Sequence, residues 1–204
     1  MKTSIFLTLI TALAVPTFAD YNSDIAEART LNKAGKLTEA RTLLKSLAEK
    51  ETIPSHKDAA LVLAASMLAY SDLKAGLNEL QTLGSTQAKA RWVGLSLVLG
   101  KASINDVESV AKSIPAPLTR AVMTSAFIKE KQWSKARDNF SLLISEVPVQ
   151  APGVFIELIK NADSVFTSKD DQVEYFNNLL RKIPAVESNA KLLGIIKSQL
   201  EILK

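Results

Sequence analysis

Apolar positions recur with helical spacing along most of this chain. In the stretch "KEKQWSKARDNFSLLISEVP", Trp133, Ala136, Phe140 and Leu143 fall on one face of an α-helix, and the second of these positions is small enough to let a neighbouring helix approach closely. We call this spacing the helix motif. The motif recurs at four other places, twice closely and twice more loosely: Leu37, Ala40, Leu44, Leu47; Leu73, Gly76, Leu80, Leu83; Ile104, Val107, Ala111, Ile114; and Val173, Phe176, Leu180, Ile183.

The segments between the motifs are apolar and rich in alanine, and they predict partner helices within 56–70, 88–100, 117–130 and 153–166. Successive motifs begin about 34 residues apart, which is the length of a helical hairpin. A proline or glycine follows each motif as an expected helix stop: Pro54, Gly84, Pro115, Pro148 and Pro184. Because one hairpin cannot bury both of its faces, the pattern predicts an all-α fold in which about five hairpins stack into an α-solenoid.

The last segment predicts one more amphipathic helix, at about residues 186–203. Leu192, Leu193, Ile196 and Leu200 share one side of it. We expect this helix to cap the apolar end of the last hairpin, because an uncapped end would expose apolar surface to water. The alternative is a helix that dimerises or binds a partner.

Two stretches, "AGKLTEARTLLKSLAEK" and the one quoted above, resemble the tetratricopeptide repeat (TPR) family. The matching positions are Gly35, Ala40, Ala136, Phe140 and Pro148, and the resemblance extends over residues 22–184 with degenerate repeats. Gly76, Val107 and Phe176 stand where the family has a small alanine.

The resemblance implies that the first helix of each hairpin lines a concave surface that binds a segment of another protein. It nominates these partner-binding residues: Arg29, Asn32, Lys33, Trp92, Ser125, Ile128 and Lys129, with Asn22, Ile25, Ser96 and Leu118 on the same face. Trp92 would be the aromatic anchor. The alternative is that Trp92 packs in the core, as a tryptophan in an apolar run often does.

Composition agrees with a helical protein that holds itself together by packing. The chain has 204 residues, of which 47% are hydrophobic and only 6% aromatic, and it contains no cysteine. The missing cysteine excludes disulfides, thiolate catalysis, cysteine-based zinc sites and lipoprotein attachment. The net charge of +4 is spread along the chain without a basic block, so we expect no nucleic acid partner.

The first nineteen residues have the layout of a cleavable secretory signal. Lys2 precedes an apolar run over 5–15, and the small-residue site Thr17-Phe18-Ala19 follows. We predict cleavage between Ala19 and Asp20, with residues 20–204 forming the helical repeat domain. This layout predicts a periplasmic or secreted bacterial protein without a stable membrane span after cleavage.

Candidate catalytic residues are few. His56 is the only histidine, so a two-histidine metal site is excluded, and we expect a solvated or capping residue in preference to a general base. Ser-x-x-Lys sequences, among them those at 71–74 and 109–112, occur without the other elements of the serine acylases. Asp170, Asp171 and Glu174 begin a predicted helix, where carboxylates complement the helix dipole, and we prefer that interpretation to a cation site.

These observations predict a non-catalytic scaffold for protein–protein interaction, with no cofactor and no metal. The expected partner is a segment of another envelope or periplasmic protein. The alternative is a periplasmic binding protein that holds a small apolar or lipidic ligand in a helical cavity.

Overall fold

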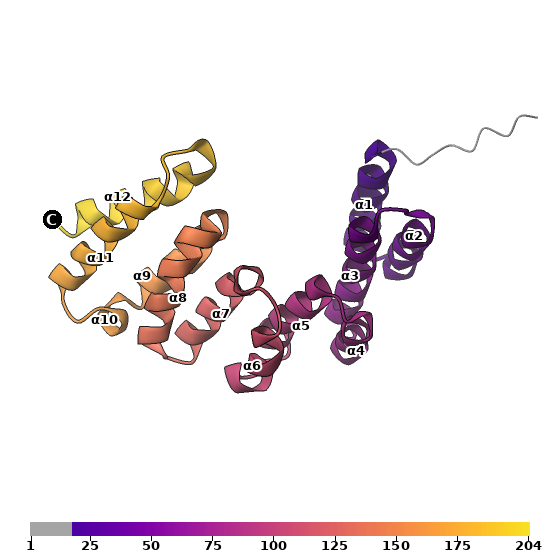
Figure 1. Cartoon of the computed structure of the whole chain (residues 1–204), viewed down its shortest axis with the longest axis horizontal. Helices are drawn as coiled ribbons and strands as arrows, with labels where there is room; N and C mark the ends of the chain where they lie inside the picture. Colours follow the sequence, from indigo (N-terminus) through magenta and orange to yellow (C-terminus); the bar gives the residue numbers. More distant parts are fainter. Residues whose placement is uncertain (1–17) are drawn as a thin grey trace, which may run out of the picture. The chain divides into compact units, whose positions relative to one another are not determined.

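The computed structural model describes residues 18–204, and every regular element in this range is a helix (Figure 1). The elements are α1 (Phe18–Lys33), α2 (Leu37–Lys50), α3 (Pro54–Ser71), α4 (Leu73–Leu83), α5 (Thr86–Val98), α6 (Ile104–Lys112), α7 (Arg120–Lys129), α8 (Trp133–Glu146), α9 (Ala151–Lys160), α10 (Ala162–Val165), α11 (Lys169–Lys182) and α12 (Ala190–Ile202), with short 3-10 turns η1 (Ala116–Leu118), η2 (Pro148–Gln150) and η3 (Glu187–Asn189). The prediction of an all-α protein is confirmed for this range. All but the last two residues of the predicted signal peptide, 1–19, lie outside it.

The chain forms two compact units, one up to Ala64 and one from Ala65 onward. In the first unit α1 packs against α2. Its start is fixed to α3 by Tyr21, whose ring stacks on that of His56 at 4.2 Å and whose hydroxyl donates to the His56 carbonyl oxygen at 3.1 Å. The Arg41 side chain donates to the carbonyl of Ala64 at 3.2 Å.

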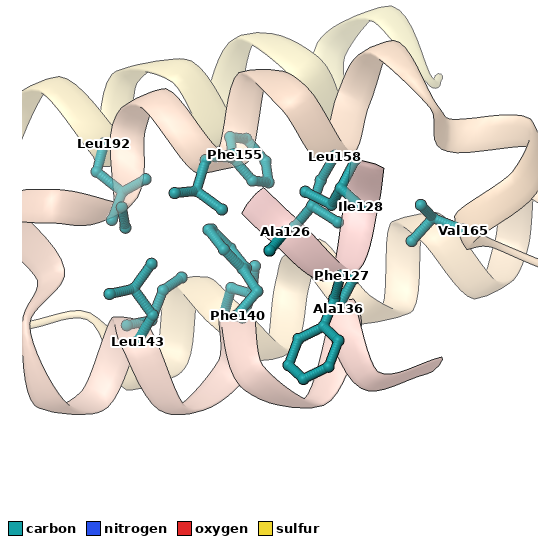
Figure 2. Close-up of a cluster of buried hydrophobic side chains, with 14 of the residues drawn as sticks. Ala126, Phe127, Ile128, Ala136, Phe140, Leu143, Phe155, Leu158, Val165 and Leu192 are labelled. Carbon is teal, nitrogen blue, oxygen red and sulfur yellow. The ribbon is translucent and has the colours of Figure 1, made fainter. Parts of the chain in front are cut away.

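The second unit contains most of the buried core. Helix α5 contacts α4, α6 and α7; α7 contacts α8 and α9; and α12 contacts α9 and α11. Phe140 of α8 points toward Phe155 of α9, with ring centroids 5.5 Å apart (Figure 2), and Phe155 meets Phe176 of α11 at 5.1 Å. All three rings are fully buried, so they join α8, α9 and α11 in one apolar cluster.

The helix motif predicted both the helices and their buried faces. In four of the five cases its first position is the first residue of a helix: Leu37, Leu73, Ile104 and Trp133. The small second positions Ala40 and Ala136 are 0% exposed. The stacking of the hairpins into a solenoid stays a prediction.

Two hairpins, α1–α2 and α7–α8, close with the same turn. Gly35 and Lys131 both have positive φ, +77° and +58°, and their amides donate to Asn32 and Ile128 respectively, each at 3.0 Å. The next amide in each turn donates to the carbonyl five residues earlier: Lys36 to Leu31 at 2.9 Å, and Gln132 to Phe127 at 2.8 Å. A left-handed backbone suits glycine, so Lys131 holds the same turn with a residue that is strained there.

Some predicted boundaries were wrong. Pro54 begins α3 and does not end α2, which stops at Lys50, where the Glu51 carboxylate accepts the amides of the next two residues at 2.8 and 2.9 Å. The predicted partner helix within 153–166 is broken at Asn161 into α9 and α10. None of the helices in residues 18–204 is long and apolar enough to cross a bilayer.

Candidate functional site

A hollow of about 620 Å³ lies between α5, α7 and α9. It is lined by the carboxyl ends of α5 and α9 and by residues of α7, and we call it the interhelix hollow. Its apolar lining includes Leu97 and Val98 from α5 and Val122 and Ile128 from α7. Val98 is 66% exposed, although Leu95 and Leu97 of the same helix are buried. An exposed valine in a concave apolar surface offers a contact point for a ligand's apolar group.

Charged side chains form the rim of the interhelix hollow. The cations are Lys101, Lys129 and Lys160, all exposed, and none of them forms an ion pair with a residue in 18–204. The anions are Glu130 and Glu157. Both carboxylate oxygens of Glu130 already accept hydrogen bonds, from the Ile104 amide at 2.7 Å and from the Gln132 side chain at 3.0 Å. The rim therefore carries three lysines without an ion pair in the described part of the chain, against two glutamates, of which Glu130 is already hydrogen-bonded.

Lys101 has a feature that the other rim residues lack. Its φ is +53°, in the left-handed region, where a residue other than glycine is strained by about 1 kcal/mol. Lys131 has the same strain at +58° but does not line the hollow. Replacing either lysine by glycine would relieve the same backbone strain, but only the change at Lys101 would remove a side chain from the hollow. The two variants therefore separate the effect of the Lys101 side chain from the effect of the strained backbone.

Three of the predicted partner-binding residues come together in this hollow: Ser125, Ile128 and Lys129. Ile128 is only 7% exposed, so it belongs to the wall and is not the exposed contact that was expected. Trp92 lies elsewhere. It is partly buried against the core and lines two other hollows, one of about 500 Å³ and one of about 240 Å³.

The other predicted residues, Arg29, Asn32 and Lys33, belong to α1 in the first unit. Arg29 and Lys33 are exposed and Asn32 is partly buried. Arg29 lines a hollow of about 330 Å³ beside Tyr21.

Sequence reasoning missed Val98, Lys101, Lys160 and Asn161 as lining residues of the interhelix hollow. Helix α5 is apolar around most of its circumference, so no periodicity separates exposed Val98 from its buried neighbours. These four residues lie at or just beyond the carboxyl ends of α5 and α9. The sequence predicted a helix that runs on to residue 166, so it gave no signal that Lys160 and Asn161 lie at a helix end.

His56 is part of the packing of the first unit. It is partly buried, its Nδ1 lies 3.3 Å from a Glu51 carboxylate oxygen, and its ring stacks on Tyr21. The sequence predicted a solvated or capping residue; the ring stays partly exposed, but Tyr21, 35 residues away along the chain, stacks on it. The amide of Ile53, followed by the contact with His56, lowers the pKa of Glu51.

Asp171 also has a structural role. It accepts two hydrogen bonds from the Arg137 guanidinium, both at 2.9 Å, and one from the Thr167 amide at 2.9 Å. These bonds lower its pKa, the Arg137 hydrogen bonds most. Arg137 in turn lies over the rings of Phe166 and Tyr175, at 5.1 and 4.9 Å from the centroids. We call this set the Arg137 clamp.

The N-cap of α11 is Ser168, whose hydroxyl accepts from the Asp171 amide at 3.0 Å. Asp170 and Asp171 both lie in the first turn of this helix, as the capping interpretation expected. No group of three or more His, Asp or Glu side chains within the described residues is arranged to hold a metal ion.

No protein-family model, curated protein or solved structure matches this chain. The functional argument therefore depends on the geometry of the chain's own residues.

Proposed function

We propose that this protein is a non-catalytic interaction scaffold of the bacterial periplasm or cell envelope, and that it binds a segment of a partner protein in the interhelix hollow. One observation carries the proposal: an apolar lining and three unpaired lysines enclose a hollow of about 620 Å³. Pockets that bind small ligands commonly have volumes of about 300–1,000 Å³, so the hollow is large enough to take apolar side chains of a peptide segment.

The arrangement of helices in the second unit supports a TPR-like row of hairpins. The first helices of successive hairpins, α5, α7 and α9, contact one another in that order, and α12 packs on α9 and α11 where a capping helix would lie. In this proposal the fold is an α-solenoid of about five hairpins, with α12 as its cap. The predicted signal peptide over residues 1–19 would export it.

The expected partner segment combines one or two apolar side chains with nearby carboxylates. The apolar groups would contact Val98 and Val122, while the carboxylates would lie near Lys101, Lys129 and Lys160. Buried apolar anchors contribute most of the affinity, and rim charges mainly increase the association rate. Arg29, Asn32 and Lys33 remain proposed contacts outside this hollow.

In-cell photo-cross-linking tests the proposal. A benzophenone amino acid replaces Ser125 in the hollow, and in a control protein it replaces Ser198 on the exposed side of α12. We expect a discrete protein adduct from position 125 and none of the same mass from position 198. Mass spectrometry of the adduct identifies the partner, whose affinity is then measured with purified proteins.

Two matched pairs of variants then locate the binding surface. Val98→Gln should weaken binding by about tenfold or more, whereas Ile202→Gln, which removes another exposed apolar side chain, should have no effect. Lys101→Gly should slow association at low salt, whereas Lys131→Gly relieves the same backbone strain without touching the hollow. Unchanged affinity in both Val98→Gln and Lys101→Gly would overturn the proposal.

The alternative, a binding protein for a small apolar or lipidic ligand, predicts a different outcome. Native mass spectrometry of the protein purified from its own host would then show retained lipid, and position 125 would give no protein adduct.

A further inference from the structure

A second hollow, between α4 and α5, has a different chemistry. Its volume is about 500 Å³, and its lining includes Asn78 and Gln81 of α4 and Trp92 and Ser96 of α5. It shares only Ala102 with the interhelix hollow. Lys74 is the single charged residue in its lining, so the site is close to neutral. We call it the Trp92 hollow.

Ser96 is the unusual member of this lining. It is 4% exposed, and its Oγ makes no hydrogen bond, although its backbone carbonyl accepts from the Ala102 amide at 3.0 Å. A serine inside a helix commonly donates to the carbonyl four residues earlier, as Thr82 and Thr124 do here. A buried hydroxyl without a partner is destabilising, and such groups are rare in folded proteins.

The other polar groups around the hollow are also uncommitted. The side-chain amides of Asn78 and Gln81, one turn apart on α4, are exposed and make no hydrogen bond to another residue within 18–204. Each amide has both a donor and an acceptor, and so does the Ser96 hydroxyl. Trp92 adds a partly exposed aromatic surface.

We infer that the Trp92 hollow is a binding site for a ring saccharide. A sugar ring has an apolar face of C–H groups, which can lie against an indole, and a rim of hydroxyls, which both donate and accept hydrogen bonds. An aromatic side chain combined with a few placed polar groups is the general form of a small-ligand site. A fatty acyl chain would leave the Ser96 hydroxyl unpaired, and an anionic ligand would find only one cation.

This inference is independent of the interhelix hollow and tests a different surface. Isothermal titration calorimetry of the whole mature protein would use three ring saccharides as probes: maltotriose, cellotriose and tri-N-acetylchitotriose. Three comparators are sorbitol, which has the hydroxyls without a ring, decanoate, and an acidic hexapeptide. We expect saturable binding of at least one trisaccharide and none of sorbitol. Quenching of Trp92 emission in a Trp133→Phe background should follow the same isotherm.

Ser96→Ala separates a ligand-binding hydroxyl from a structural one. Removing the unpaired hydroxyl should raise the urea midpoint of unfolding and weaken saccharide binding by about fivefold. Ser198→Ala, on the exposed side of α12, provides the control for helix propensity and should leave binding unchanged. A structural hydroxyl would instead give a lower midpoint in Ser96→Ala.

Several outcomes overturn the inference. One is that none of the three trisaccharides binds. Another is that Ser96→Ala leaves saccharide binding unchanged, whichever way the unfolding midpoint moves. Displacement of a bound trisaccharide by the hexapeptide or by decanoate would show a site of another class. Failure of the Ser125 cross-link would leave this result unaffected, because the two hollows have separate probes.

Discussion

Gly76 provides the sharpest test of the packing. It is the second position of the helix motif in α4, where two of the other four copies have alanine, and it is buried against α3. A Cβ added to Gly76 would lie 2.5 Å from the Cβ of Ala69 and closer still to the backbone N and Cα of that residue. Backbone atoms of a helix cannot move aside as the end of a flexible side chain can. Gly76→Ala should therefore force α3 and α4 apart.

The magnitude is set by two opposing effects. Exchanging glycine for alanine in a helix interior is worth about 0.5–1 kcal/mol of stabilisation. Adding a methyl group to a close-packed contact typically costs about 1–3 kcal/mol, and a clash with backbone belongs at the upper end. We expect a net loss of about 1–2 kcal/mol in the free energy of unfolding.

Urea unfolding followed by circular dichroism measures this difference, with Gly194→Ala as the control. Gly194 lies inside α12, and a Cβ there would meet nothing within 4 Å. Its substitution should stabilise the protein by about 0.5–1 kcal/mol, so the two variants should move the midpoint in opposite directions. An equal increase in both would show that α3 and α4 are not in backbone contact at Gly76.

The remaining predictions use the same measurements. Ala40→Leu and Ala136→Leu should each lower the free energy of unfolding by about 1–3 kcal/mol, because both positions are 0% exposed; unchanged midpoints would mean that the motif faces solvent. Lys131→Gly should raise the thermal midpoint by removing left-handed strain worth about 1 kcal/mol, and a lower midpoint would contradict that strain. Asp171 has a lowered pKa in the folded protein, so its stabilising effect is full above the ordinary carboxyl pKa and is lost as the pH falls through the folded value. Asp171→Asn should therefore be destabilised at pH 7 and show a flatter acid unfolding curve than the wild type, and parallel curves would exclude the ion pair with Arg137.

The helices were predictable from the sequence because period and turn residues are local signals. The motif starting at Leu37 or Trp133 fixes both a helix start and a buried face within a dozen residues. Gly76 looked like a departure from the pattern, and only the position of Ala69 explains why alanine is too large there. The left-handed turn at Lys131 could not be predicted from the sequence, because a lysine stands where such a turn usually has glycine.

The candidate sites were less predictable because they depend on contacts between distant segments. Val98 is exposed only because neighbouring helices leave it uncovered, and nothing in its local sequence distinguishes it from Leu97. The sequence predicted that Ser96 lies on the concave face. That its hydroxyl has no hydrogen-bond partner among the described residues depends on the surrounding helices and could not be predicted. The predicted residues Ser125 and Lys129 did fall in one hollow, because both lie on the same side of a single helix.

The Arg137 clamp has a consequence for how the second unit unfolds. It joins α8 to the start of α11 across 34 residues, so α9 and α10 form a loop whose two ends are held together without a covalent bond. Closing such a loop costs chain entropy, and the clamp can form only after that closure has occurred. Amide hydrogens in α9 and α11 should then exchange with solvent through a shared opening, at similar rates. The chain has no cysteine, so this ion pair and its two aromatic rings provide the kind of long-range link between segments that a disulfide provides in other small proteins.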